Sequence, residues 1–303
     1  MSSQQVVLVT GSSSGFGRRI VETLARQGHN VFASMREATG RNAAHAQALR
    51  ELAQREQLAL SVLDLDVTSD TSVDQAVQSV LEQAGRIDVL INNAGIVYTG
   101  VTEAYTLEQV QAHMEVNFFG QLRLDRAVLP AMHRQHSGLL IHMSSVSGGL
   151  LFPFVTLYSA SKMALEAVAE GYHYELTALG IESIILEPGL FATGLLRGQQ
   201  EPHDQERLIP YGELANIPAQ ILHNTEAANS GPEAQDPQLV ANVVADLIAQ
   251  PRGTRPLRTI IGTEPGLAPV NVAKAQAQQS VLDSWGLRQP LAFKIPDKET
   301  QER

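Results

Sequence analysis

The sequence predicts an α/β protein in which helices cover both faces of a doubly wound parallel sheet of seven strands. Short, continuous apolar runs have the character of strands that are buried on both faces. Amphipathic segments with helical spacing alternate with these runs, as right-handed crossovers between parallel strands require. Glycine and asparagine follow several runs directly, which places them at the carboxyl ends of the strands, where such sheets bind ligands.

The first half of the chain alternates strand and helix. The run Val6–Val9 leads into a glycine-rich turn, and Ile20, Val21 and Leu24 then mark a helix that ends near Gly28. We expect the next strands at Asn30–Met35, Leu58–Leu65 and Ile87–Ile91, with helices between them marked by Leu49 and Leu52 and by Val73, Val77 and Val80.

The second half continues the alternation with longer helices. We expect a helix from about Leu107 to His133, a strand at Leu139–Met143, a helix from Tyr158 to about Leu179, a strand at Ile181–Leu186 that Glu187-Pro188-Gly189 breaks, a helix at Leu239–Ile248 and a seventh strand at Leu257–Ile261. The order predicts a Rossmann-like fold.

The domain prediction follows from where the strand signals stop. Residues 1–262 form one dinucleotide-binding and catalytic domain, and its segment from about 194 to 237, which lacks strand signals, is interpreted as a substrate lid. Residues 263–303 are interpreted as a C-terminal extension that packs on or trails the same domain, with a helix around 272–285 and a polar tail.

Composition excludes several classes of function. The net charge is −10 without a block of like charges, so a nucleic-acid partner is not expected. No run approaches the roughly 20 apolar residues of a membrane span, and no signal-peptide core is present, so we expect a cytoplasmic protein without a membrane partner. There is no cysteine, and the nine histidines do not combine with carboxylates at zinc-binding spacings, so no metal site is predicted.

The glycine-rich turn Thr10-Gly11-Ser12-Ser13-Ser14-Gly15-Phe16-Gly17 stands between a strand and a helix. Such a turn lets backbone N–H groups approach a pyrophosphate at the positive end of a helix. Taken alone, it is equally consistent with a plain tight turn.

Tyr158 and Lys162 lie one helical turn apart, so the two side chains share one helix face. An ammonium beside a phenol stabilises the phenolate, so we expect Lys162 to lower the Tyr158 pKa from about 10 toward the range of a general acid or base. An isolated pair of this kind is more often ordinary helix surface. Its significance depends on the other motifs.

Together the motifs resemble the short-chain dehydrogenase/reductase family, in family order and on the expected elements. They are Thr10-Gly11-x-x-x-Gly15-x-Gly17, Asp66-Val67, Asn92-Asn93-Ala94-Gly95, Asn117, Ser145, Tyr158-x-x-x-Lys162 and Pro188-Gly189-x-x-x-Thr193. The overall layout is most similar to the hydroxysteroid and retinol dehydrogenase branch.

The resemblance implies four catalytic residues. Tyr158 would exchange a proton with the substrate oxygen, and Lys162 would hold the nicotinamide ribose and lower the Tyr158 pKa. Ser145 would stabilise charge on the carbonyl oxygen, and is favoured over Ser144 and Ser147 by its offset to Tyr158. Asn117 would distort its helix and hold a water that links Lys162 to solvent.

The resemblance also implies the cofactor contacts. The turn of Gly11, Ser13, Gly15, Phe16 and Gly17 would carry the pyrophosphate. Asp66 with Val67 would contact the adenine, for which Asp64 is the rival. Asn92 would lie along the adenosine ribose, beside Ala94 and Gly95. The nicotinamide would be fixed by Pro188, Gly189 and Thr193 together with Tyr158 and Lys162.

NADP(H) is the predicted cofactor, with NAD(H) as the alternative. Met35 occupies the position at which NAD-preferring relatives carry an acid, and the next residue, Arg36, suits a phosphate. Glu37 is the acid that would favour NAD(H), and Arg36 is otherwise a solvated loop charge. Arg18 and Arg41 are further candidates for the phosphate.

The predicted function is hydride transfer between the nicotinamide and an alcohol, ketone or aldehyde of a fairly apolar substrate, with Tyr158 as general acid/base. A dinucleotide-binding sensor without turnover is the alternative. Apolar side chains would line the substrate pocket unless they are plain packing, and besides the Ser145 hydroxyl they include Leu150, Phe152, Phe191 and Leu195. A homodimer or homotetramer is expected, paired through the helices of Asn117 and Tyr158. Their outer faces carry Ala164, Leu165, Val168 and Ala169, unless these residues pack on the sheet instead.

Overall fold

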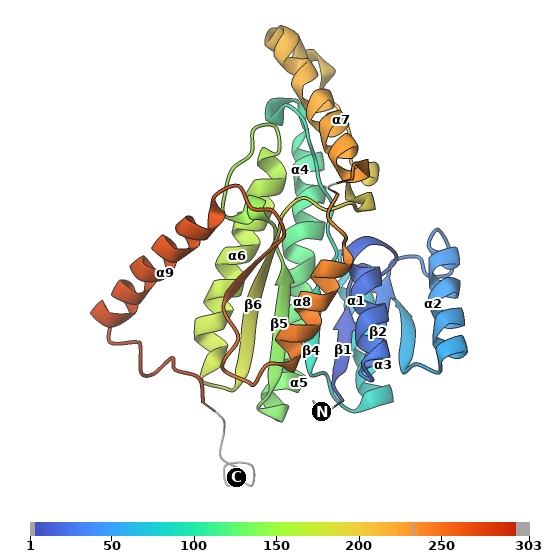
Figure 1. The fold of residues 1–303 in the computed structure, drawn as a ribbon, viewed down its shortest axis with the longest axis vertical. Coiled ribbons are helices and arrows are strands. Elements are labelled where there is room, and N and C mark those ends of the chain that lie inside the picture. Colours follow the sequence, from blue (N-terminus) through green and yellow to red (C-terminus); the bar gives the residue numbers. More distant parts are fainter. Residues whose placement is uncertain (1–3, 233, 295–303) are drawn as a thin grey trace.

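The computed structural model describes residues 4–232 and 234–294, except for the side chains of residues 197 and 198. Its centre is a seven-stranded parallel sheet in the order β3-β2-β1-β4-β5-β6-β7, which confirms the predicted fold class (Figure 1). The strands are β1 (Val6–Val9), β2 (Asn30–Met35), β3 (Leu60–Asp64), β4 (Val89–Asn92), β5 (Gly138–Met143), β6 (Ile181–Pro188) and β7 (Arg258–Ile261).

Helices connect every pair of consecutive strands. The α-helices are α1 (Gly15–Arg26), α2 (Ala43–Glu56), α3 (Asp70–Ala84), α4 (Leu107–Met114), α5 (Gly120–Gln135), α6 (Thr156–Thr177), α7 (Ile217–Ser230), α8 (Gln238–Ala249) and α9 (Leu267–Ser284). Shorter 3₁₀ segments are η1 (Thr102–Ala104), η3 (Val146–Gly148), η4 (Gly194–Gly198) and η5 (Gln205–Asn216), and η2 (Glu115–Phe119) is a π-helical turn.

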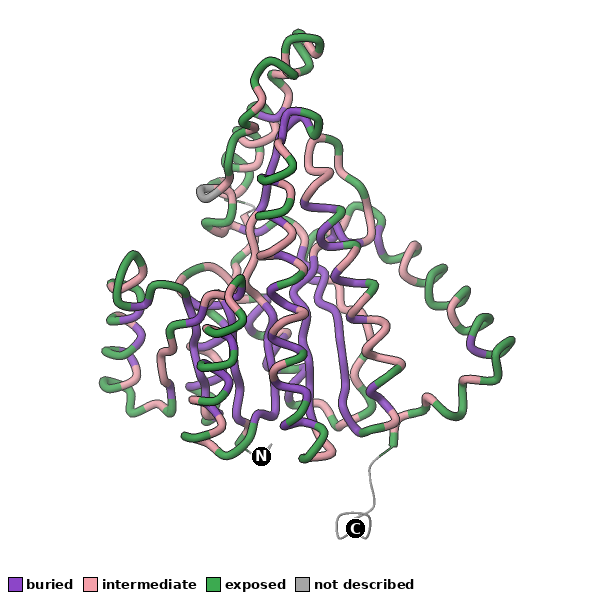
Figure 2. Tube along the Cα trace, turned by 180° about the vertical axis from the view of Figure 1, so that it is seen from behind, coloured by how far each residue is buried: buried purple, intermediate pink, exposed green. Residues whose placement is uncertain are grey.

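Two apolar layers sandwich the sheet because successive strand residues point to opposite faces. Val7 and Val9 of β1 belong to the layer that α1, α2 and α8 cover. Val6 and Leu8 belong to the opposite layer, which α3, α5 and α6 cover. The strands therefore form the buried interior of the molecule, while exposed residues concentrate on the outer sides of the helices (Figure 2).

The strand order reverses direction at β1. From β1 the chain proceeds outward to β2 and β3, and then returns to the other side of β1 to build β4 through β7. The crevice at such a switch point is where doubly wound sheets bind ligands. The fold therefore places the turn after β1 and the loop after β4 at the two sides of one crevice.

Two strand predictions need correction. The third strand is Leu60–Asp64 and not Leu58–Leu65. It lies at the edge of the sheet and pairs only with β2, and this pairing ends where Asp64 lies opposite Met35. The sixth strand does not break at Glu187 but continues to Pro188. Beyond Leu186 it pairs only with β7, so the missing N–H of Pro188 costs no bond to β5.

The long helix expected from Leu107 to His133 is divided into α4, the π-helical turn η2 and α5. The lid segment is helical, and its helix α7 projects beyond the sheet at the top of Figure 1. In the C-terminal extension the expected helix is α9, and the end of the polar tail lies outside the described residues. No helix within the described part of the chain has the length and apolar character needed to span a bilayer.

The sheet core sets a stability prediction. Leu140 in β5 is fully buried in the layer beneath α5. Leu140→Ala should lower the free energy of unfolding by about 2 to 5 kcal/mol, since it removes methyl groups and leaves a cavity. Leu107→Ala, at a residue that is 75% exposed, should change it by less than about 0.5 kcal/mol. Urea denaturation of both variants measures the contrast, and equal losses would contradict the burial of Leu140.

Candidate active site

The polar motifs converge at the carboxyl ends of β1, β4, β5 and β6. The turn after β1 lies against the loop after β4, where Thr10 Oγ1 accepts hydrogen bonds from the backbone N–H groups of Asn93 and Ala94, each at 3.0 Å. A Cβ added at Gly11 would approach Ala94 Cα to 2.9 Å, and Gly11 has a φ of +68°. Glycine is therefore required at position 11, because it has no Cβ to clash with Ala94 and adopts a positive φ without strain.

Gly15 and Gly17 keep the same turn free of side chains. A Cβ at Gly17 would collide with the Gly11 carbonyl and the Asn93 amide. One at Gly15 would lie 3.7 Å from Thr193 Cβ, so the turn after β1 faces the segment after β6. Ser14 precedes α1 and makes no side-chain cap to the first helical turn. Backbone N–H groups at the start of α1 thus remain available to an anion, which fits a dinucleotide pyrophosphate.

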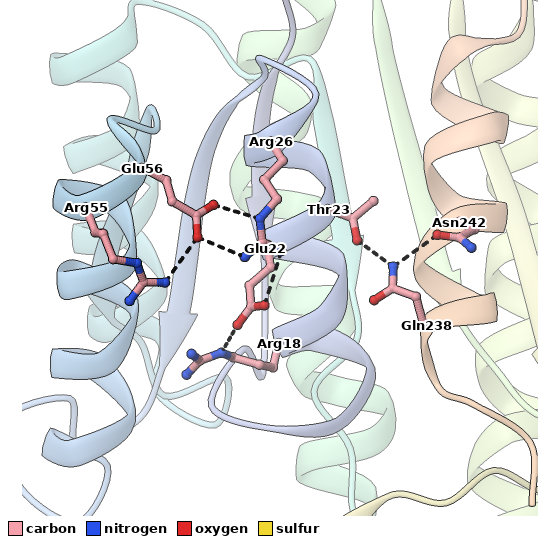
Figure 3. A network of polar contacts seen from close by, with 8 residues as sticks. All are labelled: Arg18, Glu22, Thr23, Arg26, Arg55, Glu56, Gln238 and Asn242. Carbon is pink, nitrogen blue, oxygen red and sulfur yellow. Dashed lines mark hydrogen bonds and ion pairs between the residues drawn. The ribbon is translucent and has the colours of Figure 1, made fainter.

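Helix α1 is held in place by polar contacts on both sides (Figure 3). Arg26 Nε donates to Glu56 of α2 at 2.8 Å, and the Gln238 amide of α8 donates to Thr23 at 2.8 Å. Glu22 pairs with Arg18 and Arg26 of its own helix. Arg18 is thus engaged with Glu22, which weakens its candidacy for a cofactor phosphate.

Asn92 does not occupy the place predicted for it. Its side chain is fully buried, and its amide donates to Asp125 of α5 at 2.7 Å, so it faces the interior and not a ribose. Asn93, for which no contact was predicted, lies at the turn instead, and its amide donates to the Thr10 and Gly11 carbonyls at 2.8 and 3.1 Å. Strand alternation carried the signal: Leu90 faces the α5 layer, and Asn92, two residues later, faces the same way.

Tyr158 lies buried in the first turn of α6, with the Ser145 hydroxyl at the end of β5 as a hydrogen-bonding neighbour. Ser144 turns the other way and donates to Glu166 at 2.7 Å. Ser147 is buried, and its N–H donates to Ser145 Oγ at 3.1 Å. Of the three candidate serines, the structure therefore brings Ser145 to the phenol.

The predicted effect of Lys162 on Tyr158 is wrong in this structure. Burial raises the pKa of Tyr158 to about 12, with the Ser145 hydrogen bond acting in the opposite direction. The Lys162 ammonium is 5.7 Å from the Tyr158 ring centroid and donates to the Met143 carbonyl at 2.7 Å. Burial also lowers the Lys162 pKa to about 8, against the raising effect of Glu166. Loss of water contacts outweighs the Ser145 hydrogen bond at Tyr158 and the attraction of Glu166 at Lys162.

Asn117 lies within the π-helical turn η2, as the predicted helix distortion requires. Its Oδ1 accepts from the Ile96 N–H, and its Nδ2 donates to the Ile96 carbonyl, both at 2.8 Å. Nδ2 also donates to Ser161 Oγ at 3.1 Å, and Ser161 in turn donates to the Tyr158 carbonyl at 2.7 Å. A Cβ at Gly95 would lie between Asn117 Oδ1 and Lys162 Nζ, at 3.4 and 3.7 Å. The predicted catalytic residues are therefore neighbours.

The end of β2 adjoins the glycine-rich turn. The Ser12 N–H of this turn donates a hydrogen bond to the Ser34 carbonyl of β2 at 2.9 Å. Met35 is buried, whereas Arg36 and Glu37 are exposed. Across the residues described, no carboxylate pairs with the Arg36 guanidinium. The Glu37 carboxylate lies by Gly40 in its own turn. Arg36 is thus an exposed charge at the end of β2, beside the glycine-rich turn.

The predicted adenine contacts lie after β3. Asp66 accepts from Thr68 N–H and Oγ1 at 2.9 and 2.7 Å, and Val67 is buried against Gly120. The rival Asp64 accepts from Ala38 N–H at 3.1 Å. These contacts to the cofactor stay predictions.

The segment after β6 contributes its backbone more than its apolar side chains. Gly189 N–H donates to the Ile261 carbonyl at 2.9 Å, and a Cβ there would strike the Thr263 carbonyl. Phe191 is buried in the core and meets Phe16 edge-on, with ring centroids 5.4 Å apart. Packing therefore explains Phe191, and its predicted substrate contact is not supported. Leu150, Phe152 and Leu195 are at least partly accessible, as a substrate contact requires.

Two cavities lie beside the site and not over it. One of about 350 Å³ is bordered by Gly148, Gly149 and the outer side of α6, and one of about 240 Å³ lies between α6 and the C-terminal extension. Tyr158 lines neither of them. Over residues 4–232 and 234–294, no group of three histidine, aspartate or glutamate side chains is arranged to hold a metal ion.

Comparison with known proteins assigns the geometry to a family. The short chain dehydrogenase family model matches residues 5–204. The 3-ketodihydrosphingosine reductase of Bacteroides thetaiotaomicron is 36% identical over 207 residues, which cover 66% of this chain and 71% of the relative. Retinol dehydrogenase 8 of Bos taurus is 35% identical over 260 residues, covering 82% and 79%.

Solved structures agree with this assignment. A short-chain dehydrogenase from Streptomyces avermitilis superimposes with a TM-score of 0.74 at 30% identity, covering 94% of this chain and 97% of the other. More distant structures of the same fold were solved with an NADP derivative or with NAD. At 23% identity these two structures show the shared fold.

The buried Asn92–Asp125 pair gives a pH prediction. Burial raises the Asp125 pKa from 3.8 to about 8. The unfolded chain loses this proton first, so the carboxyl contributes stability at low pH that is lost as the pH rises toward 8. Asp125→Asn has no such proton. Between about pH 4 and pH 8 its unfolding free energy should gain at least about 1 kcal/mol relative to the parent protein.

Chemical denaturation at both pH values measures this difference. The exposed Asp74→Asn serves as control and should show no such gain. A pH-independent difference for Asp125→Asn would mean that Asp125 is ionised in the fold.

Proposed function

Because the chain belongs to the short-chain dehydrogenase/reductase family, an oxidoreductase family, we propose that it is an NADP(H)-dependent alcohol dehydrogenase or carbonyl reductase. Hydride passes between the nicotinamide and the carbon of an alcohol or carbonyl group, and Tyr158 is the general acid/base. The observation that carries the proposal is the convergence of Tyr158, Ser145, Lys162 and Asn117 at the carboxyl ends of β4 and β5.

The residues of the chain supply proton transfer and charge stabilisation. The Tyr158 phenol, with its raised pKa, is protonated at neutral pH and is ready to donate to a carbonyl oxygen as hydride arrives at the carbon. The Ser145 hydroxyl donates to the same oxygen and stabilises its developing charge. In the oxidation direction the phenolate must form, which burial of Tyr158 opposes and the Ser145 hydrogen bond favours.

The proposed cofactor site extends from the turn after β1 to Thr193. The glycine-rich turn and the start of α1 hold the pyrophosphate, and NADP(H) supplies or accepts the hydride when it is bound. Arg36 supports NADP(H) over NAD(H), because it is exposed and free of a carboxylate partner while the position before it carries a buried methionine. A guanidinium suits a 2′-phosphate.

The proposed substrate is fairly apolar. Leu150, Phe152 and Leu195 supply apolar surface near the segment that carries Ser145 and Tyr158. Two relatives are named for a ketosphingosine and for a retinol, both molecules with long apolar parts. Activity on bulky ketones and little on small polar ones is therefore expected.

We also propose a homodimer or homotetramer formed through α5 and α6. Leu165 and Ala169 cannot serve as the predicted outer face, because both are buried against the rest of the domain. The outward residues of α6 are instead Ala160, Met163 and Ala167, and Phe119 before α5 is 44% exposed. These residues define the apolar surface for pairing.

The first test concerns Tyr158. Tyr158→Phe removes the proton donor and should lower kcat for ketone reduction by about 10²- to 10⁴-fold. NADPH binding, measured by fluorescence titration, should stay within about threefold, because the pyrophosphate and Arg36 contacts remain. Tyr172→Phe in the same helix is the control. Unchanged turnover of Tyr158→Phe on a panel of ketones and aldehydes would refute the assignment.

The second test concerns the cofactor. Arg36→Ala should weaken NADPH binding about ten- to a hundredfold while sparing NADH, since a charge-assisted hydrogen bond contributes about 1.5 to 3 kcal/mol. Arg50→Ala on the exposed side of α2 is the matched control. Better turnover of NADH than of NADPH by the parent protein would favour NAD(H) instead.

The third test concerns assembly. Sedimentation at micromolar concentration should give the mass of a dimer or tetramer. Met163→Glu places a charge on the outer face of α6 and should raise the dissociation constant at least about tenfold, because an unpaired charge becomes buried in the interface. A monomer in the parent protein would overturn the assembly proposal.

A further inference from the structure

His113 is a buried residue that the proposed reaction does not use. It lies in the last turn of α4, four residues before Asn117, and is 1% exposed. Its imidazole packs between two tyrosines. The ring centroid is 4.6 Å from that of Tyr98 and 6.3 Å from that of Tyr158, which it meets nearly at right angles, at 78°. The His113 and Tyr158 rings are therefore neighbours in a T-shaped arrangement.

The imidazole also joins the polar group that supports Tyr158. His113 Nε2 lies 3.3 Å from Asn117 Nδ2, and the same amide reaches the Tyr158 carbonyl through Ser161. Burial and the Lys162 charge lower the His113 pKa to about 4, so the ring is neutral at physiological pH. A neutral aromatic ring at this point excludes water from the phenol without adding a second cation beside Lys162.

Tyr98 connects this ring to the lid. Its hydroxyl donates to Gln200 Oε1 at 3.1 Å, and its ring stacks on Tyr105, with centroids 5.2 Å apart. Tyr105 donates to the Gln200 carbonyl at 3.1 Å. The lid is thus bound to Tyr98, against which His113 packs, and to Tyr105, on which Tyr98 stacks.

Gln109 ties the next lid residues to α4, the helix that carries His113. Its amide nitrogen donates to the Glu201 carbonyl at 2.9 Å, and its oxygen accepts from His203 N–H at 3.0 Å. Residues 200–203 of the lid therefore contact α4 and Tyr98 together.

We propose that His113 is a positioning residue that holds the Tyr158 phenol for proton transfer and couples closure of the lid at residues 200–203 to that position through Tyr98. The coupling rests on the proposed function, since it concerns the same proton donor. It predicts that the lid regulates the chemical step as well as substrate binding. A lid that only held the substrate would change the KM for substrate alone.

Two variants distinguish the effect of the His113 ring on kcat from a general loss of stability. His113→Ala removes the ring and should lower kcat about a hundredfold, while the Kd for NADPH changes less than about threefold. His113→Phe keeps a neutral ring and should recover at least about tenfold of that loss. His29→Gln, at a buried histidine near the amino ends of the strands, is the control and should leave kcat unchanged. Wild-type kcat in folded His113→Ala would overturn the proposal.

A readout without turnover tests the same point if the enzyme assignment itself fails. The ionisation of Tyr158 is followed by ultraviolet difference titration, with Tyr158→Phe as the blank. His113→Ala should admit water and move the Tyr158 pKa from about 12 back toward 10, whereas His113→Phe should leave it raised. An unmoved pKa in His113→Ala would refute the positioning role, whether or not a substrate is known.

The lid coupling is tested by a double-mutant cycle. Gln200→Ala removes the acceptor of the Tyr98 hydroxyl from an exposed lid residue and should lower kcat severalfold in the parent protein. In the His113→Ala background the same change should have little effect on kcat, because the connection to Tyr158 is already broken. Equal effects of Gln200→Ala in both backgrounds would overturn the coupling.

Discussion

The pairing of the Asn117 side chain with both backbone groups of Ile96 is the interaction on which the site depends. It fixes the loop after β4 to the π-helical turn, and through Ser161 it fixes the start of α6 as well. A regular helix would rotate Asn117 away from Ile96, so the extra residue of the π turn is what brings three elements together. The glycine-rich turn, Tyr158 and Lys162 take their relative places from this junction.

The fold was predictable because the sheet is buried on both faces. A run such as Val6–Val9 is apolar throughout, so the strands and their parallel direction follow from the sequence. The first and last residues of the strands were harder to predict, because a strand extends only as far as a neighbouring strand pairs with it. Pro188 belongs to β6 only because β7 pairs with it there, and nothing local to Pro188 indicates this.

The sequence predicted which residues meet at the candidate site better than it predicted their pKa values. Ser145 and Asn117 lie where the motif order placed them, but the direction of the Tyr158 pKa shift was wrong, because a sequence gives no measure of water exclusion. Asn92 faces the interior and not the crevice, which strand alternation could have indicated. His113 carries no motif, and only the approach of Tyr98 and Tyr158 from other parts of the chain gives it a place.

The contact between α9 and β6 bears on where the domain ends. Glu187 is fully buried, and the amide of Asn271 in α9 donates to it at 2.6 Å, while Arg258 stays 3.8 Å away. Burial raises the Glu187 pKa to about 7. A chain cut after β7 would lose this amide and open the carboxylate to water next to Pro188. The last helix is therefore a structural part of the end of the crevice beside Pro188, and an expression boundary at residue 262 would alter that end.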